Sequence, residues 1–371
     1  MANELMTPPA SVRPRFLARS KLREVLDQRV ETYFARSGRD PRGGARLILK
    51  SAVFLGWAVS SYLLLLLWAS TAWLTVPLAA SLGLALAGIG FSVMHDGGHG
   101  AFSRRPWLNR LSAGVLDLIG GSSYFWRQKH NVLHHTFTNL DGIDDDLDAG
   151  PFLRLAPTQQ LRWFHRFQSW YEIPLLGFLA AKWTLLDDWV TLGRAKIGDS
   201  PVPRPRGWDS AQLVGGKLFF LTWALVVPLL LHPLFVVLGV FALTAVVTGI
   251  TLGIVFQLAH VVEETLITKA PATGERLERP WVEHQLATTA DFAPHSRLIT
   301  WYVGGLNFQV EHHLFPRVSH VHYRAVSRIV REVCQELGVA HLRHETLRGA
   351  LKSHFRCLGQ LGRPAPLAPA L

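Results

Sequence analysis

The chain has 371 residues, a formal net charge of +11 at neutral pH, 49% hydrophobic residues and 2 cysteines. This composition excludes a disordered or collagen-like chain, and two cysteines are too few for a disulfide scaffold. Residues 51–94 and 218–259 contain no Asp, Glu, Lys or Arg, although charged residues make up 18% of the chain. We therefore expect an integral membrane protein with substantial aqueous parts.

The first 50 residues form a polar, basic segment with 11 Lys and Arg residues. The segment does not resemble a secretory signal peptide, because no apolar stretch begins before Leu47. We expect residues 1–50 to be an aqueous segment that precedes a membrane domain at residues 51–330.

Each of the two uncharged blocks predicts a pair of membrane-spanning helices. A helix needs roughly 20 apolar residues to cross a bilayer, and each block is about twice that long. The first block is expected to turn near Ser70–Pro77, and the second at the helix-breaking pair His232–Pro233. The expected spans are residues 51–71, 74–94, 213–232 and 235–257.

Three shorter apolar runs are interrupted too soon to cross a bilayer. They are residues 111–126, 173–181 and 298–310. We expect each of them to be an interfacial or a buried segment. The proline-containing stretch 197–208 is interpreted as a linker into the second helical hairpin.

Lys and Arg residues lie on one side of the four expected spans. Segment 95–217 holds 14 and the chain after residue 260 holds 13, whereas the two turns hold none. The positive-inside rule then places the N-terminus, the middle segment and the C-terminal tail 331–371 in the cytoplasm. A membrane-flanking role explains these basic residues, so we expect no nucleic-acid partner.

Histidines cluster in three short stretches: HDGGH at 95–99, HNVLHH at 130–135 and QVEHH at 309–313. Residues four apart share one face of a helix, so His95 and His99 form a pair of aligned imidazoles. The second stretch repeats that spacing. Neighbouring histidines, such as His312 and His313, diverge by roughly 100° on a helix and can therefore serve two different ions.

The three clusters predict a site for two transition-metal ions. By the expected topology they all lie on the cytoplasmic side, close to the membrane. One HxxxH alone would be interpreted as structural, but seven clustered histidines exceed what one ion can use. The clusters contain no Cys and no HExxH, which argues against thiolate zinc sites, iron–sulfur centres and zincin proteases. Imidazole alone does not choose between zinc, copper, iron and nickel.

Other polar residues leave two interpretations open. His260, at the end of the fourth span, is either a ligand or a hydrogen-bonded helix end. His284, His320 and His322 are ambiguous, and His320 and His322 follow the third cluster closely enough for an outer role in support of the ligands. The acidic run 141–148, DGIDDDLD, is either a solvated turn or a source of carboxylates that accept the outer N–H of ligand imidazoles. The remaining histidines are interpreted as surface or structural residues: His165, His232, His295, His341, His344 and His354.

These stretches resemble the three histidine boxes of the membrane fatty acid desaturases. The strings HNVLHHTFTNLDGIDDDLD at 130–148 and GGLNFQVEHHLFPRVSHVHY at 304–323 resemble the branch that includes front-end and linoleoyl-CoA-type desaturases. In that branch Gln replaces the first His of the third box, as Gln309 does here. The resemblance, over about residues 50–330, implies an all-α integral membrane fold. Its four transmembrane helices form two hairpins, and a cytosolic helical cap holds a histidine-rich di-iron site.

The resemblance also implies the reaction and the ligands. The reaction is the O₂-dependent insertion of a cis double bond into an acyl chain carried by CoA or a lipid. No catalytic residue is expected apart from the metal ligands. By match of position, the ligands of the two irons are His95, His99, His130, His134, His135, His260, Gln309, His312 and His313. An amide oxygen is a weaker donor than imidazole, so Gln309 either binds iron directly, binds it through water, or only donates a hydrogen bond.

Three further residues are candidates for lining a substrate tunnel. Tyr124 and Trp126 directly precede the second box, and Asn307 precedes the third. Packing is the alternative role for each of them.

Electrons are expected to come from a separate protein. Many front-end desaturases carry a fused cytochrome b5 domain with an HPGG motif, and the segment before Leu47 contains no His. The expected donor is a protein such as ferredoxin or cytochrome b5, and a basic cytoplasmic surface suits an acidic redox partner.

Two alternatives to a desaturase remain. A hydroxylase or ketolase acting on alkyl, carotenoid or sphingoid substrates uses the same boxes, because its chemistry diverges only after the first hydrogen is removed; the Gln at 309 favours desaturation. A non-catalytic membrane metal carrier would place polar ligands inside the spans. His232 is the only histidine in the two uncharged blocks, which disfavours a carrier.

Overall fold

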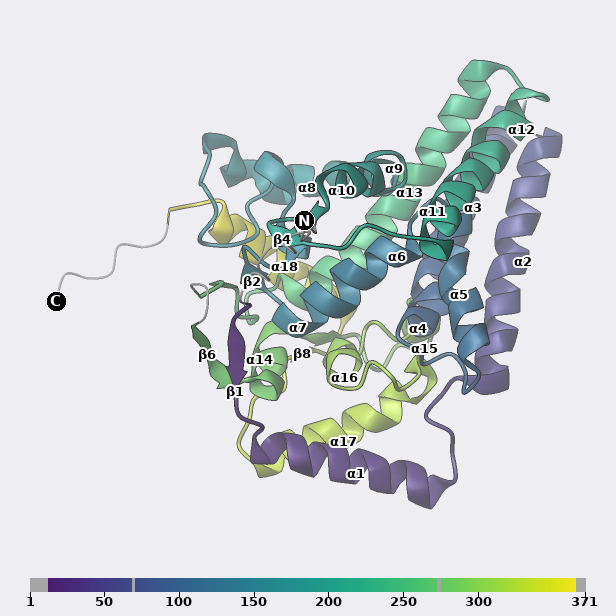
Figure 1. Ribbon diagram of the computed structural model, residues 1–371. Coiled ribbons are helices and arrows are strands. Elements are labelled where there is room, and N and C mark those ends of the chain that lie inside the picture. The colour runs from purple at the N-terminus through teal and green to yellow at the C-terminus, as the bar shows by residue number, and fades with distance from the viewer. Residues whose placement is uncertain (1–12, 69–70, 272–274, 365–371) are drawn as a thin grey trace, which may run out of the picture.

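The computed structural model describes residues 13–68, 71–271 and 275–364. Both ends of the chain, and Ser70 of the expected first turn, lie outside the described residues. The described chain is helical, with a bundle of long helices and a cap of shorter helices at one end of the bundle (Figure 1). This arrangement confirms the expected all-α membrane fold.

Four helices among the described residues are long and apolar enough to cross a bilayer: Gly44–Trp68, Trp73–Gly98, Trp208–Leu229 and Leu234–His260. The first is α2 (Gly44–Trp68) and the fourth is α13 (Leu234–His260). The second joins α3 (Ala72–Ile89), the π-helical turn η1 (Gly90–Met94) and α4 (His95–Gly98). The third joins α11 (Trp208–Leu221), η7 (Thr222–Val226) and α12 (Val227–Leu229).

The first and third helices begin several residues before the expected spans. Each helix includes a lysine: Lys50 lies in the part that precedes the expected first span, and Lys217 lies within the expected third span. Lys50 Nζ lies 2.9 Å from His320 Nε2, and Lys217 Nζ lies 2.6 Å from Asp188 Oδ2. These partners satisfy both ammonium groups inside the protein, so the helices continue past them.

Close backbone contact holds the second and fourth spans together. A Cβ on Gly83 of α3 would lie 2.8 Å from the Thr244 carbonyl oxygen of α13. The Thr248 hydroxyl donates to the Gly83 carbonyl oxygen at 3.1 Å, and that of Thr244 to the Ala79 carbonyl oxygen at 3.2 Å. Small residues and hydrogen bonds between helices are typical of packing inside membranes.

The cap is built from the chain before the first span, between the second and third, and after the fourth. Its helices are α1 (Lys21–Ser37), α5 (Pro106–Leu118), α6 (Ser123–Trp126), α7 (His135–Phe137), α8 (Gln168–Leu176), α9 (Leu179–Lys182), α10 (Asp188–Arg194), α14 (Trp281–Thr288), α15 (Arg297–Tyr302), α16 (Gln309–Leu314), α17 (Tyr323–Glu336) and α18 (Leu347–Leu361). Two π-helical segments, η2 (Arg127–His134) and η6 (Trp183–Asp187), continue α6 and α9. The 3-10 turns are η3 (Asp145–Leu147), η4 (Gly150–Phe152), η5 (Trp163–Phe167) and η8 (His320–His322).

Short strands join distant parts of the cap in two-stranded ladders. Three are parallel: β1 (Arg15–Leu17) with β6 (Arg276–Pro280), β2 (Leu140–Asp141) with β5 (Thr268–Lys269), and β7 (Asp291–Phe292) with β8 (Arg343–His344). The fourth, β3 (Lys196–Ile197) with β4 (Ser200–Pro201), is antiparallel and lies in the expected linker.

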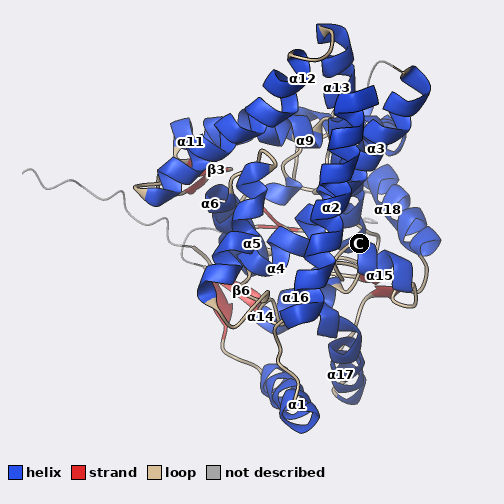
Figure 2. Ribbon diagram, turned by 90° about the vertical axis from the view of Figure 1, so that its right-hand side faces the viewer, coloured by secondary structure: helices blue, strands red, loops and turns tan. Residues whose placement is uncertain are grey.

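The apolar core of the cap fixes the third histidine stretch. Leu26 of α1, Val310 of α16, and Val326 and Val330 of α17 are all fully buried in one cluster. Val326 and Val330 are four residues apart, so they share one face of α17. Figure 2 shows α1 and α17 at the opposite end of the molecule from α12.

Candidate metal centre

The three histidine stretches meet where the second and fourth spans enter the cap. His95 begins α4 at the end of the second span, and His260 ends α13. The second stretch lies on η2 and α7, and the third on α16. His99 is partly exposed, and the other eight candidate ligands are buried.

The imidazoles form two main groups. The first contains His95, His99, His130 and His312, and the second contains His134, His260 and His313. In each group the candidate ligand nitrogens lie within 4.8 Å of one another. His312 and His313 thus divide between the groups, as expected for neighbouring residues on a helix.

His135 lies between the two groups. Its Nε2 atom is 3.2 Å from Nε2 of His130 and 2.9 Å from Nε2 of His312, and it also groups with His313. Metal–nitrogen bonds of about 2.0–2.1 Å place neighbouring ligand nitrogens roughly 3.0–3.4 Å apart. The observed spacing is therefore that of ligands around an ion.

Unpartnered buried atoms test whether a metal fits here. Nε2 of His99, His134 and His313, and Oε1 of Gln309, are buried and have no hydrogen-bond partner. A buried polar atom without a partner costs roughly 1–3 kcal/mol. The three histidine rings lie against other imidazoles, so the residues present fit a metal centre.

The outer ring nitrogens are held by the surrounding protein. Nδ1 of His134 lies 3.1 Å from Asp144 Oδ2, and Nδ1 of His312 lies 3.1 Å from the Tyr323 hydroxyl. The Asp144 carboxylate can only accept, so it assigns the proton of His134 to Nδ1 and leaves the Nε2 lone pair for an ion, whereas the Tyr323 hydroxyl orients the His312 ring without assigning its proton. Asp144 belongs to the acidic run 141–148. At least one carboxylate of that run therefore lies where it can accept the outer N–H of a candidate ligand imidazole, which is one of the two interpretations of the run.

Burial keeps most of these imidazoles neutral, whereas at His134 the neighbouring Asp144 carboxylate outweighs burial and raises the pKa. Loss of solvation lowers the pKa of His130, His135, His312 and His313 well below the usual value, and the neighbouring imidazoles lower it further. A neutral imidazole has a free lone pair, which is the form that binds metal. The environment thus favours coordination over protonation.

Gln309 faces the ligand candidate at the end of the fourth span. Its Nε2 atom lies 3.1 Å from Nε2 of His260, whose Nδ1 lies 3.3 Å from the Thr288 carbonyl oxygen. The amide nitrogen of Gln309 thus contacts His260, and its amide oxygen has no hydrogen-bond partner.

Two adjacent glycines bring the third stretch against the first. Gly304 and Gly305 both have positive φ, at 61° and 71°. A Cβ on Gly304 would lie 2.2 Å from the Phe91 carbonyl oxygen, just before His95. Only glycine permits both the conformation and the approach.

A polar chain makes a second connection between these stretches. Asp96 accepts hydrogen bonds from the Ser319 hydroxyl at 2.7 Å and from His320 Nδ1 at 3.0 Å. The other nitrogen of His320 contacts Lys50 of the first span. His320 therefore supports the residue next to His95, which is the outer role considered for it from the sequence.

Helix α14 connects the second and third stretches. Gln285 Oε1 accepts from Nδ1 of His313 at 2.8 Å and from the Thr138 hydroxyl at 2.9 Å. Its Nε2 atom donates to the His135 carbonyl oxygen at 3.2 Å, as does Trp281 Nε1. Gln285 is fully buried, so a change there acts on both stretches together.

The three candidate lining residues differ in their surroundings. Trp126 stacks on His130 with ring centroids 4.5 Å apart. The Tyr124 hydroxyl instead donates to the Pro203 carbonyl oxygen at 3.0 Å. Asn307 is fully buried, and its amide donates to the Phe292 carbonyl oxygen at 3.1 Å. These contacts bring only Trp126 to the histidines, and the lining role of all three stays a prediction.

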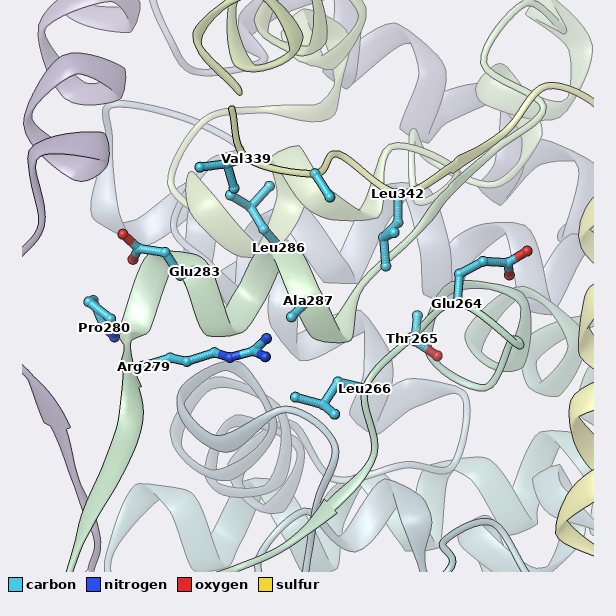
Figure 3. A pocket seen from close by; sticks show the side chains of 11 residues that line it. Glu264, Thr265, Leu266, Arg279, Pro280, Glu283, Leu286, Ala287, Val339 and Leu342 are labelled. Atoms are coloured by element: carbon cyan, nitrogen blue, oxygen red, sulfur yellow. The ribbon is translucent and has the colours of Figure 1, made fainter. Parts of the chain in front are cut away.

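A cleft on the described surface lies elsewhere. It has a volume of about 600 Å³ and opens on the outer face of α14 (Figure 3). Leu286, Ala287 and Leu266 form its apolar floor, and Arg279 and Glu283 stand at its edge. The nine candidate ligands do not line it.

A separate acidic cluster lies behind the third stretch. His341 Nε2 is 3.3 Å from Glu311 Oε1 and 3.5 Å from Asp291 Oδ2, and both carboxyl groups are fully buried. Burial, and next the nearby Glu311, raises the pKa of Asp291 well above its usual value. Burial also raises the pKa of Glu311, to about 7, so both carboxyl groups bind a proton more tightly than free ones do.

The sequence indicated the clustered histidines but not most of their partners. Gln285, Thr288 and Tyr323 lie outside the clusters, and no spacing relates them to a ligand. Tyr323 closes the string that carries the family resemblance, which is the one signal available for it.

The four spans and the two histidine groups define an integral membrane protein with a centre that can hold metal ions. The profile of the fatty acid desaturase family matches residues 71–344. The chain is 35% identical to the sn-1 linoleoyl-lipid 6-desaturase of Arthrospira platensis over 91% of this chain and 92% of that protein. It is 34% identical to the enzyme of the same name from Synechocystis sp., over 95% of this chain and 98% of that protein.

A further relative is the acyl-lipid (8-3)-desaturase of Physcomitrium patens, which is 36% identical over 91% of this chain and 71% of that protein. The chain belongs to the fatty acid desaturase family. It is an oxidoreductase that desaturates an acyl chain, and the hydroxylase alternative gains no support from these relatives, which are all named as desaturases.

Proposed function

We propose that the chain holds two iron ions in the two histidine groups. The proposed ligands are His95, His99, His130, His134, His135, His260, His312 and His313, with Gln309 beside His260. Imidazole suits several metals, and family membership favours iron. The observation that carries the proposal is the convergence of imidazoles from four separate segments, among which Nε2 of His99, His134 and His313 has no hydrogen-bond partner.

The protein's contribution is to hold and enclose the metals. When bound, two irons would activate O₂ with two electrons from outside the chain, so that hydrogen could be removed from unactivated CH₂ groups, a reaction that no side chain can perform. Asp144, Gln285 and Tyr323 orient three of the ligand rings. Trp126 covers one side of His130, and burial excludes water from most of the site.

The proposed substrate is an acyl group on a membrane lipid. Both relatives named as linoleoyl-lipid 6-desaturases match this chain over nearly their full length. A linoleoyl group carried by a lipid is therefore the first substrate to test. Position selectivity would depend on how far the chain threads past the metals from a fixed head group.

Two further parts of the proposal concern the electron donor and the topology. A separate protein such as ferredoxin or cytochrome b5 supplies the electrons, which the reaction requires from outside the chain. The N-terminus, the C-terminus and the metal centre all lie in the cytoplasm. The distribution of Lys and Arg supports this orientation, because the expected turns between the spans of each hairpin contain none.

Expression in a host with a simple fatty acid profile tests the reaction. The culture is supplied with linoleic acid, and derivatised lipids are examined by gas chromatography and mass spectrometry. The expected product is 2 Da lighter than its precursor, with a new double bond at carbon 6. A product 16 Da heavier would instead identify a hydroxylase.

Metal analysis tests the centre separately. Detergent-purified protein is expected to contain two irons per chain by plasma mass spectrometry. Stoichiometric zinc or copper, or no metal, would overturn the iron assignment even if the fold is intact.

A further inference from the structure

Asn139 combines burial with an unusual backbone conformation, four residues after His135 at the end of the second histidine stretch. Its φ is 57°, in the left-handed region, and the residue is 1% exposed. Asparagine adopts this region more readily than most residues, because its short side chain can hydrogen-bond nearby backbone groups. The chain therefore turns here with a polar amide inside the cap, where that amide needs partners.

The side-chain amide of Asn139 closes the ends of two helices. Its Nδ2 atom donates to the His260 carbonyl oxygen at 2.8 Å and to the Thr288 carbonyl oxygen at 3.2 Å. His260 is the last residue of α13 and Thr288 the last of α14, so neither carbonyl group has a partner within its own helix. A third carbonyl oxygen, that of Leu266, lies 3.1 Å from the same nitrogen. Because carbonyl oxygens only accept, the N–H groups of the amide face all three.

The backbone of Asn139 holds the carboxylate that orients His134. The backbone N–H of Asn139 donates to Asp144 Oδ2 at 2.8 Å, and the same oxygen lies 3.1 Å from Nδ1 of His134. The Asp144 side chain is buried, so water does not compete for this oxygen. The position of the His134 ring therefore depends on the turn at Asn139.

Asn139 reaches the His260 ring by a second route. Nδ1 of His260 lies 3.3 Å from the Thr288 carbonyl oxygen, and that oxygen also accepts from the Asn139 amide. Asn139 thus holds His260 at two points, which are its own carbonyl group and the carbonyl group that faces its outer ring nitrogen. One side chain sets both the end of α13 and the orientation of the ring.

These contacts reach only one of the two histidine groups. His134 and His260 both belong to the second group. Within the part of the chain that the structure describes, the hydrogen-bond partners of Asn139 include no residue of the first group, which contains His95, His99, His130 and His312. A change at Asn139 should therefore act on the two groups unequally.

We propose that Asn139 is a positioning residue for the second metal ion, acting through the His134 and His260 rings without touching the ion. The inference rests on the proposed function, because it requires an ion at each histidine group. Partners of ligand residues typically change metal affinity 10–100-fold when they are replaced. We expect a loss of this size at the second group and none at the first.

Two substitutions separate the amide of Asn139 from its backbone conformation. Asn139→Gly retains a residue that tolerates positive φ and removes the N–H groups of the side chain. Asn139→Asp retains the shape and turns a carboxyl oxygen toward the three carbonyl oxygens, so its effect should be the larger. Both variants leave all nine candidate ligands in place.

Gln168→Glu is the matched control, because it exchanges an amide for a carboxyl group elsewhere in the cap. Gln168 of α8 is also fully buried, and its Nε2 atom donates to the carbonyl oxygens of Arg154 at 3.1 Å and Leu358 at 2.8 Å. Neither α8 nor α18 carries a candidate ligand. Loss of stability without loss of iron is therefore expected for this variant.

Iron retention by the detergent-purified full chain tests the proposal. After equal exposure to a ferrous chelator, the parent and Gln168→Glu should keep two irons per chain, and both Asn139 variants about one. Mössbauer spectra should lose the signal of one iron, and the lost signal should be the one that His260→Ala also removes. Thermal melting in detergent identifies a temperature at which every variant is folded.

Three outcomes would contradict the inference. Two irons with unchanged Mössbauer signals in both Asn139 variants would overturn it and leave the two-iron proposal standing. Equal loss of both irons, or loss of the signal that His260→Ala retains, would also overturn it, because the effect would not be specific to the second group. A parent chain without iron would overturn the two-iron proposal itself, and this inference with it.

Discussion

Two buried histidines from different regions show how the molecule separates a metal site from a structural contact. His134, in the second box, has a side chain that is 1% exposed and lies 3.1 Å from Asp144. His354, on α18, is fully buried and lies 2.8 Å from Glu172. Burial and a carboxylate neighbour therefore do not distinguish the two.

The second ring nitrogen makes the difference. His354 Nδ1 lies 2.7 Å from the Val261 carbonyl oxygen, so both of its nitrogens have protein partners. His134 Nε2 has none, and its ring centre is 4.7 Å from that of His260 and 4.9 Å from that of His313. The free Nε2 atom of His134 fits a metal ligand, whereas both ring nitrogens of His354 are used in contacts within the protein.

Replacing His134 tests the ligand side of this comparison and has the largest expected effect. His134→Ala removes a proposed ligand and is expected to reduce the desaturated product below detection, with loss of iron from the purified protein. Product is measured by gas chromatography and iron by plasma mass spectrometry. Membrane fractionation serves as the control, since the protein should remain in the membrane. Surviving activity would show that the ligand assignment is wrong.

Replacing His354 tests the structural side. His354→Ala leaves Glu172 buried without its partner, which is expected to destabilise the fold by about 3–5 kcal/mol. A lower melting temperature in detergent should result, while the iron content of the folded fraction stays at the parent value. Loss of iron at temperatures where the variant is still folded would contradict the comparison.

Gln285 lies between these cases, because it touches ligands without being one. Gln285→Leu removes the acceptor for His313 Nδ1 and is expected to weaken iron binding roughly 10–100-fold. Gln285→Glu keeps that acceptor and should restore most of the binding. Iron retention during titration with a chelator measures both variants, and Mössbauer spectra report the ligand field. Equal iron retention by the Gln285→Leu variant and the parent would show that Gln285 does not position His313.

Local patterns in the sequence predict the spans and the clusters, while the contacts around them depend on the fold. Hydropathy acts along one segment, so the four helices are predictable, as is an interfacial or buried role for residues 173–181. Gln285 and His313 are distant in sequence, and only the tertiary fold brings them to 2.8 Å. The first helix begins before Lys50 for the same reason, because the partner of this lysine comes from elsewhere in the chain.

Asp291 gives the smallest expected effect and extends the comparison to a carboxyl group. Its raised pKa means that the folded state binds a proton more tightly than the unfolded state, so ionisation of Asp291 lowers stability as the pH rises above the usual value for Asp. Asp291→Asn cannot ionise, and its Oδ1 atom can still accept from the Val310 amide, 3.1 Å away. The variant should melt about 2 °C above the parent at pH 8, equivalent to roughly 1 kcal/mol. The difference should shrink at pH 5, where the parent carboxyl group is protonated more often. A lower melting temperature at pH 8 would show that the ionised carboxylate, held by His341, stabilises the fold.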